Sequence, residues 1–220
     1  MIQIRHLTVA IKGVPALSDI TMDFSPGTVT GLTGPNGSGK TMLMRVIAGL
    51  VRPTSGSVII DGRTIGKDIA FPPDMGMLLE GPAFLSGYSG FSNLCMLAGI
   101  RGVIDGPTVR DWMYRVGLDP DDKRRYGSYS LGMKQRLGIA AALMESPALV
   151  MLDEPTNALD TQGIAMVSEE VHRVRNRGAT VLLASHDANM LNNLADDLWH
   201  LAEGRTEHHE THLDGVEGQG

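Results

Sequence analysis

The sequence predicts an α/β fold built on a mainly parallel sheet. Short apolar runs bounded by Gly or Pro alternate along the chain with longer stretches in which apolar residues recur at helical spacing. Hydrophobic residues make up 42% of the 220 positions, which is enough to bury a substantial core. Strands that alternate with helices require crossover connections between parallel strands. We therefore expect ligands at the carboxyl ends of these strands.

The expected elements follow in chain order. Strand-like runs lie at residues 29–33, 58–60, 149–152 and 181–184, and helical stretches lie at residues 41–50, 109–116, 131–145, 162–176 and 188–194. The third helix stops before Pro147 and the fourth before Gly178, because both residue types end helices. Residues 84–128 contain few β-branched residues and much helical material. They predict a helical subdomain, about residues 84–145, inserted into the sheet domain.

Composition narrows the class of protein. The chain has 25 acidic and 19 basic residues, a formal net charge of −6, so it lacks the overall positive field that favours nucleic acid. Its apolar runs are strand-sized and too short to cross a bilayer, and its first residues include no apolar stretch of signal-peptide length. The lone Cys95 cannot form an internal disulfide. We expect a cytoplasmic protein with no nucleic-acid partner.

The last residues have a different composition. Residues 203–220 contain His208, His209 and His212 among Glu, Gly and Thr, with no apolar period. We predict that residues 206–220 form a disordered tail, with a metal-binding tail as the alternative.

A phosphate-binding loop is the strongest motif. The strand at residues 29–33 runs into GPNGSGKT, which opens a helix and fits the pattern G-x-x-x-x-G-K-[ST]. Glycines let consecutive backbone N–H groups point at one anion, and the helix adds the positive end of its dipole. A lysine here bridges β- and γ-phosphates, and a following hydroxyl binds Mg²⁺. The predicted phosphate and Mg²⁺ contacts are Gly34, Pro35, Asn36, Gly37, Ser38, Gly39, Lys40 and Thr41.

Acidic and histidine side chains follow two further strands. The run at residues 149–152 leads into Asp153 and Glu154, and Pro155 then stops the strand. Adjacent carboxylates at a buried strand end repel one another unless a cation neutralises them. We expect Asp153 to hold Mg²⁺ and Glu154 to polarise the water that attacks the γ-phosphate. His186, after the run at residues 181–184, is predicted to bond the γ-phosphate or that water.

Together these residues resemble the nucleotide-binding domain of an ABC transporter, over about residues 1–205. The family's P-loop corresponds to residues 34–41, and its Walker B strand ends at Asp153 and Glu154. Its D-loop matches NALD with Asp160, and its switch histidine matches His186. The resemblance implies a P-loop NTPase core with a mainly parallel sheet, an N-terminal antiparallel β region and an inserted helical subdomain.

The family signature, usually LSGGQ, is YSLGM at residues 129–133, and the following KQR is typical of exporters. Ser130 stands one residue before a helix and is predicted to cap it, while Gly132 leaves backbone N–H groups accessible. The resemblance implies a head-to-tail dimer, with itself or with another ATP-binding chain. In it the signature of one chain closes on the ATP held by the P-loop of the other, and Ser130, Gly132 and Asp160 contact the nucleotide.

Two further positions depart from the family. Where most members carry Gln in the loop that couples nucleotide to membrane subunit, MGMLLEGPAF places Glu80, as in transporters of the bacitracin and lantibiotic resistance type. We interpret Glu80 as a metal and water contact. The region VAIKG offers Ile11 where the family usually stacks adenine on an aromatic residue, which predicts about 1 to 3 kcal/mol less binding energy for the base.

The resemblance implies an ATP-hydrolysing subunit that energises a separate integral membrane permease. That partner would hold the chain peripherally on the inner face of the cell membrane. Export of an antibiotic, peptide or other hydrophobic compound is the expected task. The alternatives are a soluble ABC-type ATPase and an ATP-gated sensor that is not coupled to transport. Net charge and the short stretch between Thr41 and Ser130 argue against a role on DNA, and Glu154 argues against a sensor without turnover.

Overall fold

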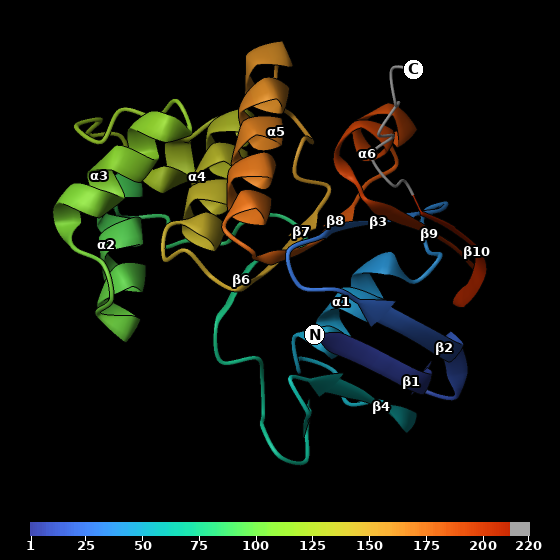
Figure 1. Ribbon diagram of the computed structural model, residues 1–220. Coiled ribbons are helices and arrows are strands. Elements are labelled where there is room, and N and C mark those ends of the chain that lie inside the picture. The colour runs from blue at the N-terminus through green and yellow to red at the C-terminus, as the bar shows by residue number, and fades with distance from the viewer. Residues whose placement is uncertain (212–220) are drawn as a thin grey trace, which may run out of the picture. The chain divides into compact units, whose positions relative to one another are not determined.

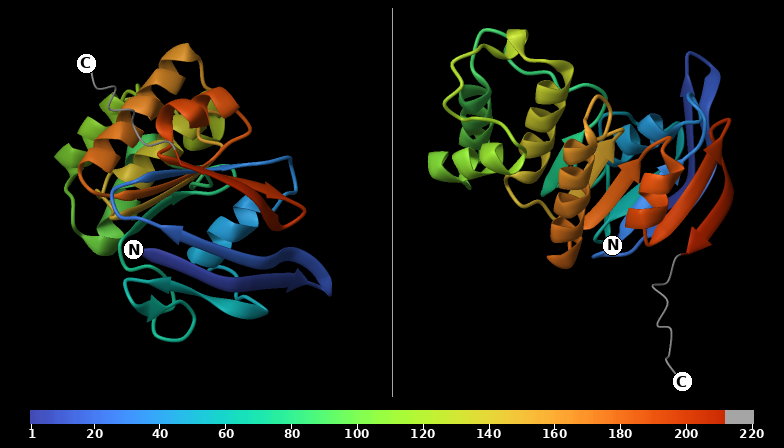
Figure 2. Two further views of the ribbon diagram at one scale, coloured as in Figure 1. Left: turned by 45° about the vertical axis from the view of Figure 1, so that its right-hand side comes forward. Right: turned by 90° about the horizontal axis from the view of Figure 1, so that it is seen from above.

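The computed structural model describes residues 1–211, and the chain divides into two compact units. The first unit contains residues 1–72 and 180 onward, and the second contains residues 73–179. Figure 1 labels most of their helices and strands, and Figure 2 gives two further views.

An antiparallel sheet forms the amino-terminal part of the first unit. Its strand order is β2 (Val14–Phe24), β1 (Ile2–Ile11), β4 (Ser55–Ile60) and β5 (Arg63–Thr64). Alternate residues of β1 and β2 are buried, among them Ile4, Leu7 and Phe24. This sheet confirms the antiparallel β region implied by the family resemblance.

A second sheet of the first unit carries the phosphate-binding loop. Strand β3 (Val29–Thr33) pairs in parallel with β8 (Thr180–Ala184) on one side and with β9 (Asp197–Ala202) on the other. All residues of β8, and all of β3 except the last, are buried, as expected for a parallel sheet covered on both faces. Among residues 1–211, the helices of this unit are α1 (Lys40–Ile47) and α6 (Ala188–Leu194). Helix α1 ends before residue 50 because Gly49 turns into the left-handed region, with φ of +77°.

The second unit contains the other parallel strand pair and most of the helices. Strand β6 (Met75–Leu78) pairs in parallel with β7 (Leu149–Asp153). Between them in sequence lie α2 (Gly90–Arg101), α3 (Gly106–Arg115), the 3-10 turn η1 (Tyr126–Ser128) and α4 (Leu131–Leu143), and α5 (Thr161–Asn176) follows β7. Helix α4 packs so closely on β6 that a Cβ at Gly76 would lie 1.7 Å from the carbonyl oxygen of Ala142. The predicted helices and the predicted strands at residues 29–33, 149–152 and 181–184 are present, whereas the predicted strand at residues 58–60 is β4 of the antiparallel sheet.

The prediction of a disordered tail over residues 206–220 is wrong for its first part. Strand β10 (Arg205–Thr211) pairs antiparallel with β9 through a two-residue turn at Glu203 and Gly204, whose φ values are +48° and +73°. The His209 ring stacks on the Trp199 ring across the hairpin at 4.0 Å. Residues 212–220, with His212, lie outside the described residues.

Residues 1–211 contain neither a membrane-spanning helix nor a cluster of metal-binding side chains. In that part of the chain, every helix is too short or too polar to cross a bilayer. The same residues contain no group of three or more His, Cys, Asp or Glu side chains that could hold a metal ion. His208 and His209 therefore do not belong to such a group within residues 1–211.

Candidate nucleotide-binding site

The phosphate-binding loop of the first unit leaves β3 and enters α1. Gly34 has φ of +140°, and a Cβ there would lie 2.0 Å from the carbonyl oxygen of Leu201 and 2.9 Å from Ser38 Oγ. Gly39 stands at the start of α1 with φ of +109°. Only glycine fits these two conformations and contacts, which explains why the loop begins and ends with this residue. The strand, loop and helix that the motif required are therefore all present.

Lys40 carries a buried positive charge within this loop. Its side chain is 7% exposed, and its ammonium group donates to the carbonyl oxygens of Gly34 at 2.7 Å and Pro35 at 3.2 Å. A buried ammonium is costly unless it is bonded, so these carbonyls fix its position. The positive charge is thereby held within the same loop whose backbone N–H groups are suited to bind phosphate.

Ser38 is the most buried polar residue of the loop, at 2% exposure. Its N–H donates to the carbonyl oxygen of Pro35 at 3.1 Å, while its Oγ has no hydrogen-bond partner among residues 1–211. A buried hydroxyl without a partner is uncommon in folded proteins and suits a site that receives a polar ligand.

His186 and the loop leave the same edge of the sheet in the first unit. In the parallel register Leu32 pairs with Ala184, and Ser185 N–H donates to the carbonyl oxygen of Leu32 at 3.2 Å. Gly34 and His186 each follow two residues after this pair. The carboxyl ends of β3 and β8 therefore bring the predicted switch histidine, which is exposed, to the edge where the phosphate-binding loop begins.

An equivalent edge in the second unit carries the acidic residues. Leu78 of β6 pairs with Leu152 of β7, and Glu80 and Glu154 each follow two residues later. Both glutamates have left-handed backbones, with φ of +59° and +49°. Such a conformation costs non-glycine residues about 1 to 2 kcal/mol, and this kind of strain is concentrated at functional sites. Asp153, the last residue of β7, is 7% exposed.

Helix α4 connects the signature to this acidic edge. Ser130 caps the helix as predicted, because its Oγ accepts from Met133 N–H at 3.2 Å. Further along α4, the side-chain amide of Gln135 donates to the carbonyl oxygens of Glu154 at 3.1 Å and Pro155 at 3.0 Å. Sequence reasoning gave Gln135 no role, since only the packing of α4 on β7 brings it there.

The loop that follows Glu154 is tied to the same helix. A Cβ at Gly132 would lie 2.8 Å from the carbonyl oxygen of Ala158, so the signature passes close to the loop. Asp160 caps α5 by accepting from Gly163 N–H at 2.8 Å and pairs with Arg136 at 2.8 Å. The bond from Gly163, together with Arg136, lowers the pKa of Asp160 below its ordinary value. The predicted D-loop aspartate is thus anchored by Arg136 of the KQR segment, a contact that the sequence did not predict.

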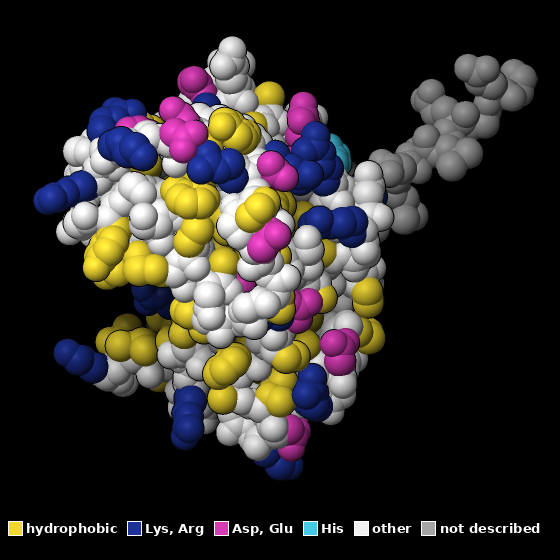
Figure 3. Space-filling model, turned by 90° about the vertical axis from the view of Figure 1, so that its left-hand side faces the viewer, with side chains coloured by type: hydrophobic (Ala, Val, Ile, Leu, Met, Phe, Trp, Pro, Cys, Tyr) yellow, Lys and Arg dark blue, Asp and Glu magenta, His cyan; other side chains and the backbone are white. Residues whose placement is uncertain are grey.

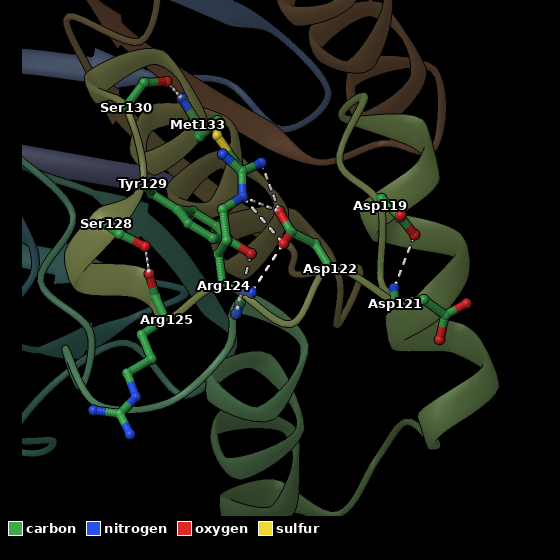
Figure 4. Close-up of polar contacts among 10 residues, drawn as sticks. Asp119, Asp121, Asp122, Arg124, Arg125, Ser128, Tyr129, Ser130 and Met133 are labelled. Atoms are coloured by element: carbon green, nitrogen blue, oxygen red, sulfur yellow. Dashed lines mark hydrogen bonds and ion pairs between the residues drawn. The ribbon is translucent and has the colours of Figure 1, made fainter.

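Tyr129, the first residue of the signature, is a packing residue. Figure 4 shows it between the ion pair of Asp122 with Arg124 and the cap at Ser130. The ring is 5% exposed, and its hydroxyl accepts from Gly90 N–H, at the start of α2, at 3.2 Å. Burial raises the pKa of this phenol. The departure from the usual leucine therefore ties the signature to α2.

Replacement of Tyr129 by Phe should destabilise the protein by about 1 to 3 kcal/mol, because a buried N–H loses its acceptor. The shift of the urea unfolding midpoint measures this effect. Tyr88→Phe is the matched control, since that side chain is 53% exposed. Equal midpoints for the two variants would contradict the proposed role of the hydroxyl.

The predicted adenine contact is at the end of β1. Ile11 is 47% exposed and precedes the turn formed by Lys12 and Gly13, whose φ values are +50° and +82°. An exposed aliphatic side chain of this kind offers a nucleobase apolar contact without ring stacking.

The fold and the site define a class. The chain has the parts of a P-loop nucleoside triphosphatase. These are a glycine-rich loop between a parallel strand and a helix, a buried lysine in that loop, and a second parallel strand that leads into Asp and Glu.

Comparisons with known proteins then identify the family. Residues 17–157 match the family described as ABC transporter. The chain is 41% identical to the uncharacterized ABC transporter ATP-binding protein YybJ of Bacillus subtilis (strain 168), with 94% of this chain and 95% of that protein covered. It is 36% identical to the lantibiotic transport ATP-binding protein SrtF of Streptococcus pyogenes, covering 93% and 88%. It is 34% identical to the bacitracin transport ATP-binding protein BcrA of Enterococcus faecalis, covering 93% and 67%.

A solved dimeric ATP-binding cassette in a post-hydrolysis state, bound to ADP and Pi, has the same fold, with a TM-score of 0.88 at 22% identity over 98% of this chain and 100% of that one. The chain belongs to the ABC transporter family and is an ATP-binding ATPase subunit of that family.

Proposed function

We propose that this chain hydrolyses Mg·ATP to energise the export of an antibiotic, peptide or other hydrophobic compound through a separate membrane permease. The names of SrtF and BcrA, which state lantibiotic and bacitracin transport, support this class of cargo. The chain would then work in the cytoplasm, held to the inner face of the membrane by its permease.

The observation that carries the nucleotide part of the proposal is the loop at residues 34–41. Lys40 is buried and fixed by hydrogen bonds to two loop carbonyl oxygens. Gly34 and Gly39 adopt backbone conformations in this loop that only glycine fits. Lys40 and the loop N–H groups bind the β- and γ-phosphates. Ser38, whose buried Oγ lacks a hydrogen-bond partner within residues 1–211, supplies a further polar group.

The chain's oxygen ligands suit Mg²⁺, which prefers hydroxyl and carboxylate oxygens and neutralises charge on the phosphates when it binds. Thr41, Asp153 and Glu80 are the proposed ligands. Glu154 accepts a proton from the attacking water, and His186 bonds the γ-phosphate or that water. Gln135 positions Glu154 by bonding its carbonyl oxygen.

Pairing of two cassettes completes the proposed mechanism. Ser130 and Gly132 at the start of α4 offer an anion-binding helix end, which we assign to the nucleotide of a second chain. Asp160 contacts the nucleotide at the same interface. The second chain is either another copy or a related ATP-binding chain, as the dimeric cassette of the same fold supports.

The proposed permease contact lies on α2. Met96, Leu97 and Ile100 are 41%, 36% and 79% exposed, and Val103 beyond the helix is 55% exposed. Figure 3 views the side of Figure 1 that carries α2 and α3, where hydrophobic side chains lie among acidic and basic ones. An exposed apolar helix face suits a short amphipathic helix of a partner.

Capture from native membranes tests this function. The tagged chain should retain one polytopic membrane protein after detergent extraction, and Ile100→Glu should release it. Leu50→Glu is the matched control, because Leu50 is 59% exposed but lies beside α1 in the other unit. Phosphate release without a retained membrane protein would favour a soluble ATPase, and nucleotide binding without phosphate release would favour a sensor.

Replacement of Glu80 by Gln should shift the Mg²⁺ dependence of ATP turnover to higher concentration by about threefold to tenfold, since the edge beside Glu154 loses one negative charge. Phosphate release measured across Mg²⁺ concentrations checks this. Glu169→Gln, at a 69% exposed side chain, provides the control for loss of charge. An unchanged Mg²⁺ profile would remove Glu80 from the proposed ligands.

A further inference from the structure

The turn between β9 and β10 is bonded to the phosphate-binding loop. The Gly204 N–H donates to the carbonyl oxygen of Ser38 at 3.0 Å, and the Gly204 carbonyl oxygen accepts from Ser18 N–H at 2.8 Å. One residue of the carboxyl-terminal hairpin therefore links the loop to β2 within the first unit.

The packing around this link leaves no room for a side chain. A Cβ at Gly204 would lie 2.6 Å from the carbonyl oxygen of Ala16 and 3.2 Å from Leu17 Cα. A Cβ at Gly39 would lie 2.7 Å from Leu17 Cδ2 and 3.5 Å from Gly204 Cα. Most of these neighbours are backbone atoms, which cannot swing aside as a long side chain can. The phosphate-binding loop, β2 and the turn between β9 and β10 are therefore packed tightly against one another.

The link fixes the orientation of one phosphate-binding amide. The Ser38 carbonyl and the Gly39 N–H belong to the same planar trans peptide, so they point in opposite directions. The Ser38 N–H is itself bonded to Pro35 at 3.1 Å, which holds the preceding peptide. When Gly204 anchors the Ser38 carbonyl, the Gly39 N–H is turned away from the hairpin, as a phosphate-binding loop requires of its amides.

We propose that Gly204 is a positioning residue for nucleotide binding, which acts through the Ser38 carbonyl to orient the Gly39 N–H toward phosphate. This inference rests on the proposed phosphate-binding role of residues 34–41. The inference gives the hairpin of β9 and β10 a role in nucleotide binding. This hairpin follows the last of the sequence motifs, which ends at His186.

The chain contains a matched control for this residue. The turn between β4 and β5 is also made by a left-handed pair, Asp61 and Gly62, with φ of +47° and +78°. These values match those of Glu203 and Gly204, and both turns lie in the first unit. A Cβ at Gly62, however, would meet nothing within 4 Å. Alanine therefore adds the same backbone strain at both positions but a clash only at Gly204.

The experiment compares Gly204→Ala with Gly62→Ala in the full chain. The Kd for the fluorescent analogue mant-ATP is measured with Mg²⁺, together with the Tm in the absence of nucleotide. We expect Gly204→Ala to raise the Kd by about tenfold relative to Gly62→Ala. The KM for ATP should rise in parallel, while kcat at saturating ATP falls by less. Equal Kd values for the two variants would overturn the proposal.

Hydrogen exchange on the wild-type chain gives a second test that does not depend on a folded variant. Exchange of the Gly204 amide should slow several-fold when Mg²⁺ and a non-hydrolysable ATP analogue are added, whereas the Gly62 amide should not change. Equal exchange of Gly204 with and without nucleotide would overturn the proposal. If the wild-type chain failed to bind mant-ATP, the proposed function itself would be wrong, which is a different result from normal binding with an unaffected Gly204→Ala variant.

Discussion

Glu154→Gln is expected to reduce steady-state phosphate release by about 10²-fold to 10⁴-fold while ATP binding is retained, because an amide cannot accept the proton of the attacking water. The substitution keeps the size of the side chain and leaves the backbone contacts of Glu154 intact, including the bond from Gln135 to its carbonyl oxygen. The left-handed backbone at Glu154, with φ of +49°, is unchanged as well. The loss should therefore fall on kcat rather than on the Kd for nucleotide.

The measurement combines phosphate release with analytical ultracentrifugation in Mg·ATP. A chain that binds ATP but does not cleave it should accumulate as the nucleotide-bound dimer. In the wild-type chain, ATP hydrolysis allows this dimer to dissociate. Glu169→Gln on α5 serves as the control, since it removes the same charge from an exposed position and should leave phosphate release unchanged. Undiminished turnover by Glu154→Gln would assign the base to another group.

Local chemistry explains how much of the site could be predicted from the sequence. Three features depend on residues only a few positions apart, so the sequence pattern predicts them. They are the loop from Gly34 to Thr41, the cap at Ser130 and the strand end at Asp153. The parallel register that aligns Glu80 with Glu154 joins segments far apart in sequence, and apolar runs give no signal for it. The same holds for Gln135, whose role follows only from the packing of α4.

The carboxyl-terminal hairpin was missed for a different reason. Strand β10 has the sequence RTEHHET, which contains no apolar residue, so it lacks the alternation that marks a half-buried strand. Its order comes from pairing with β9 and from stacking of His209 on Trp199. The one sequence signal was Gly204, since a two-residue hairpin turn needs positive φ at both positions and glycine is favoured there.

Lys40→Met should weaken binding of Mg·ATP by about 100-fold, the loss expected when a buried charge-assisted contact to phosphate is removed. Methionine keeps a straight, unbranched side chain at the start of α1 and forms helices about as well as lysine. The chain should therefore still fold, and the Gly34 and Pro35 carbonyls lose only their bond to the ammonium group. Titration with mant-ATP measures the Kd, and the Tm without nucleotide reports folding.

Two further variants separate charge from geometry at this position. Lys67→Met removes the same charge from an exposed residue of the first unit and should leave the Kd unchanged. Lys40→Arg keeps the charge, but its planar fork cannot replace a compact ammonium at 7% exposure, so it should bind nucleotide nearly as weakly as Lys40→Met. Wild-type affinity in Lys40→Met would refute the phosphate-binding role of the loop. Recovery by Lys40→Arg would instead show that charge alone suffices and that the fixed position of the ammonium group contributes little.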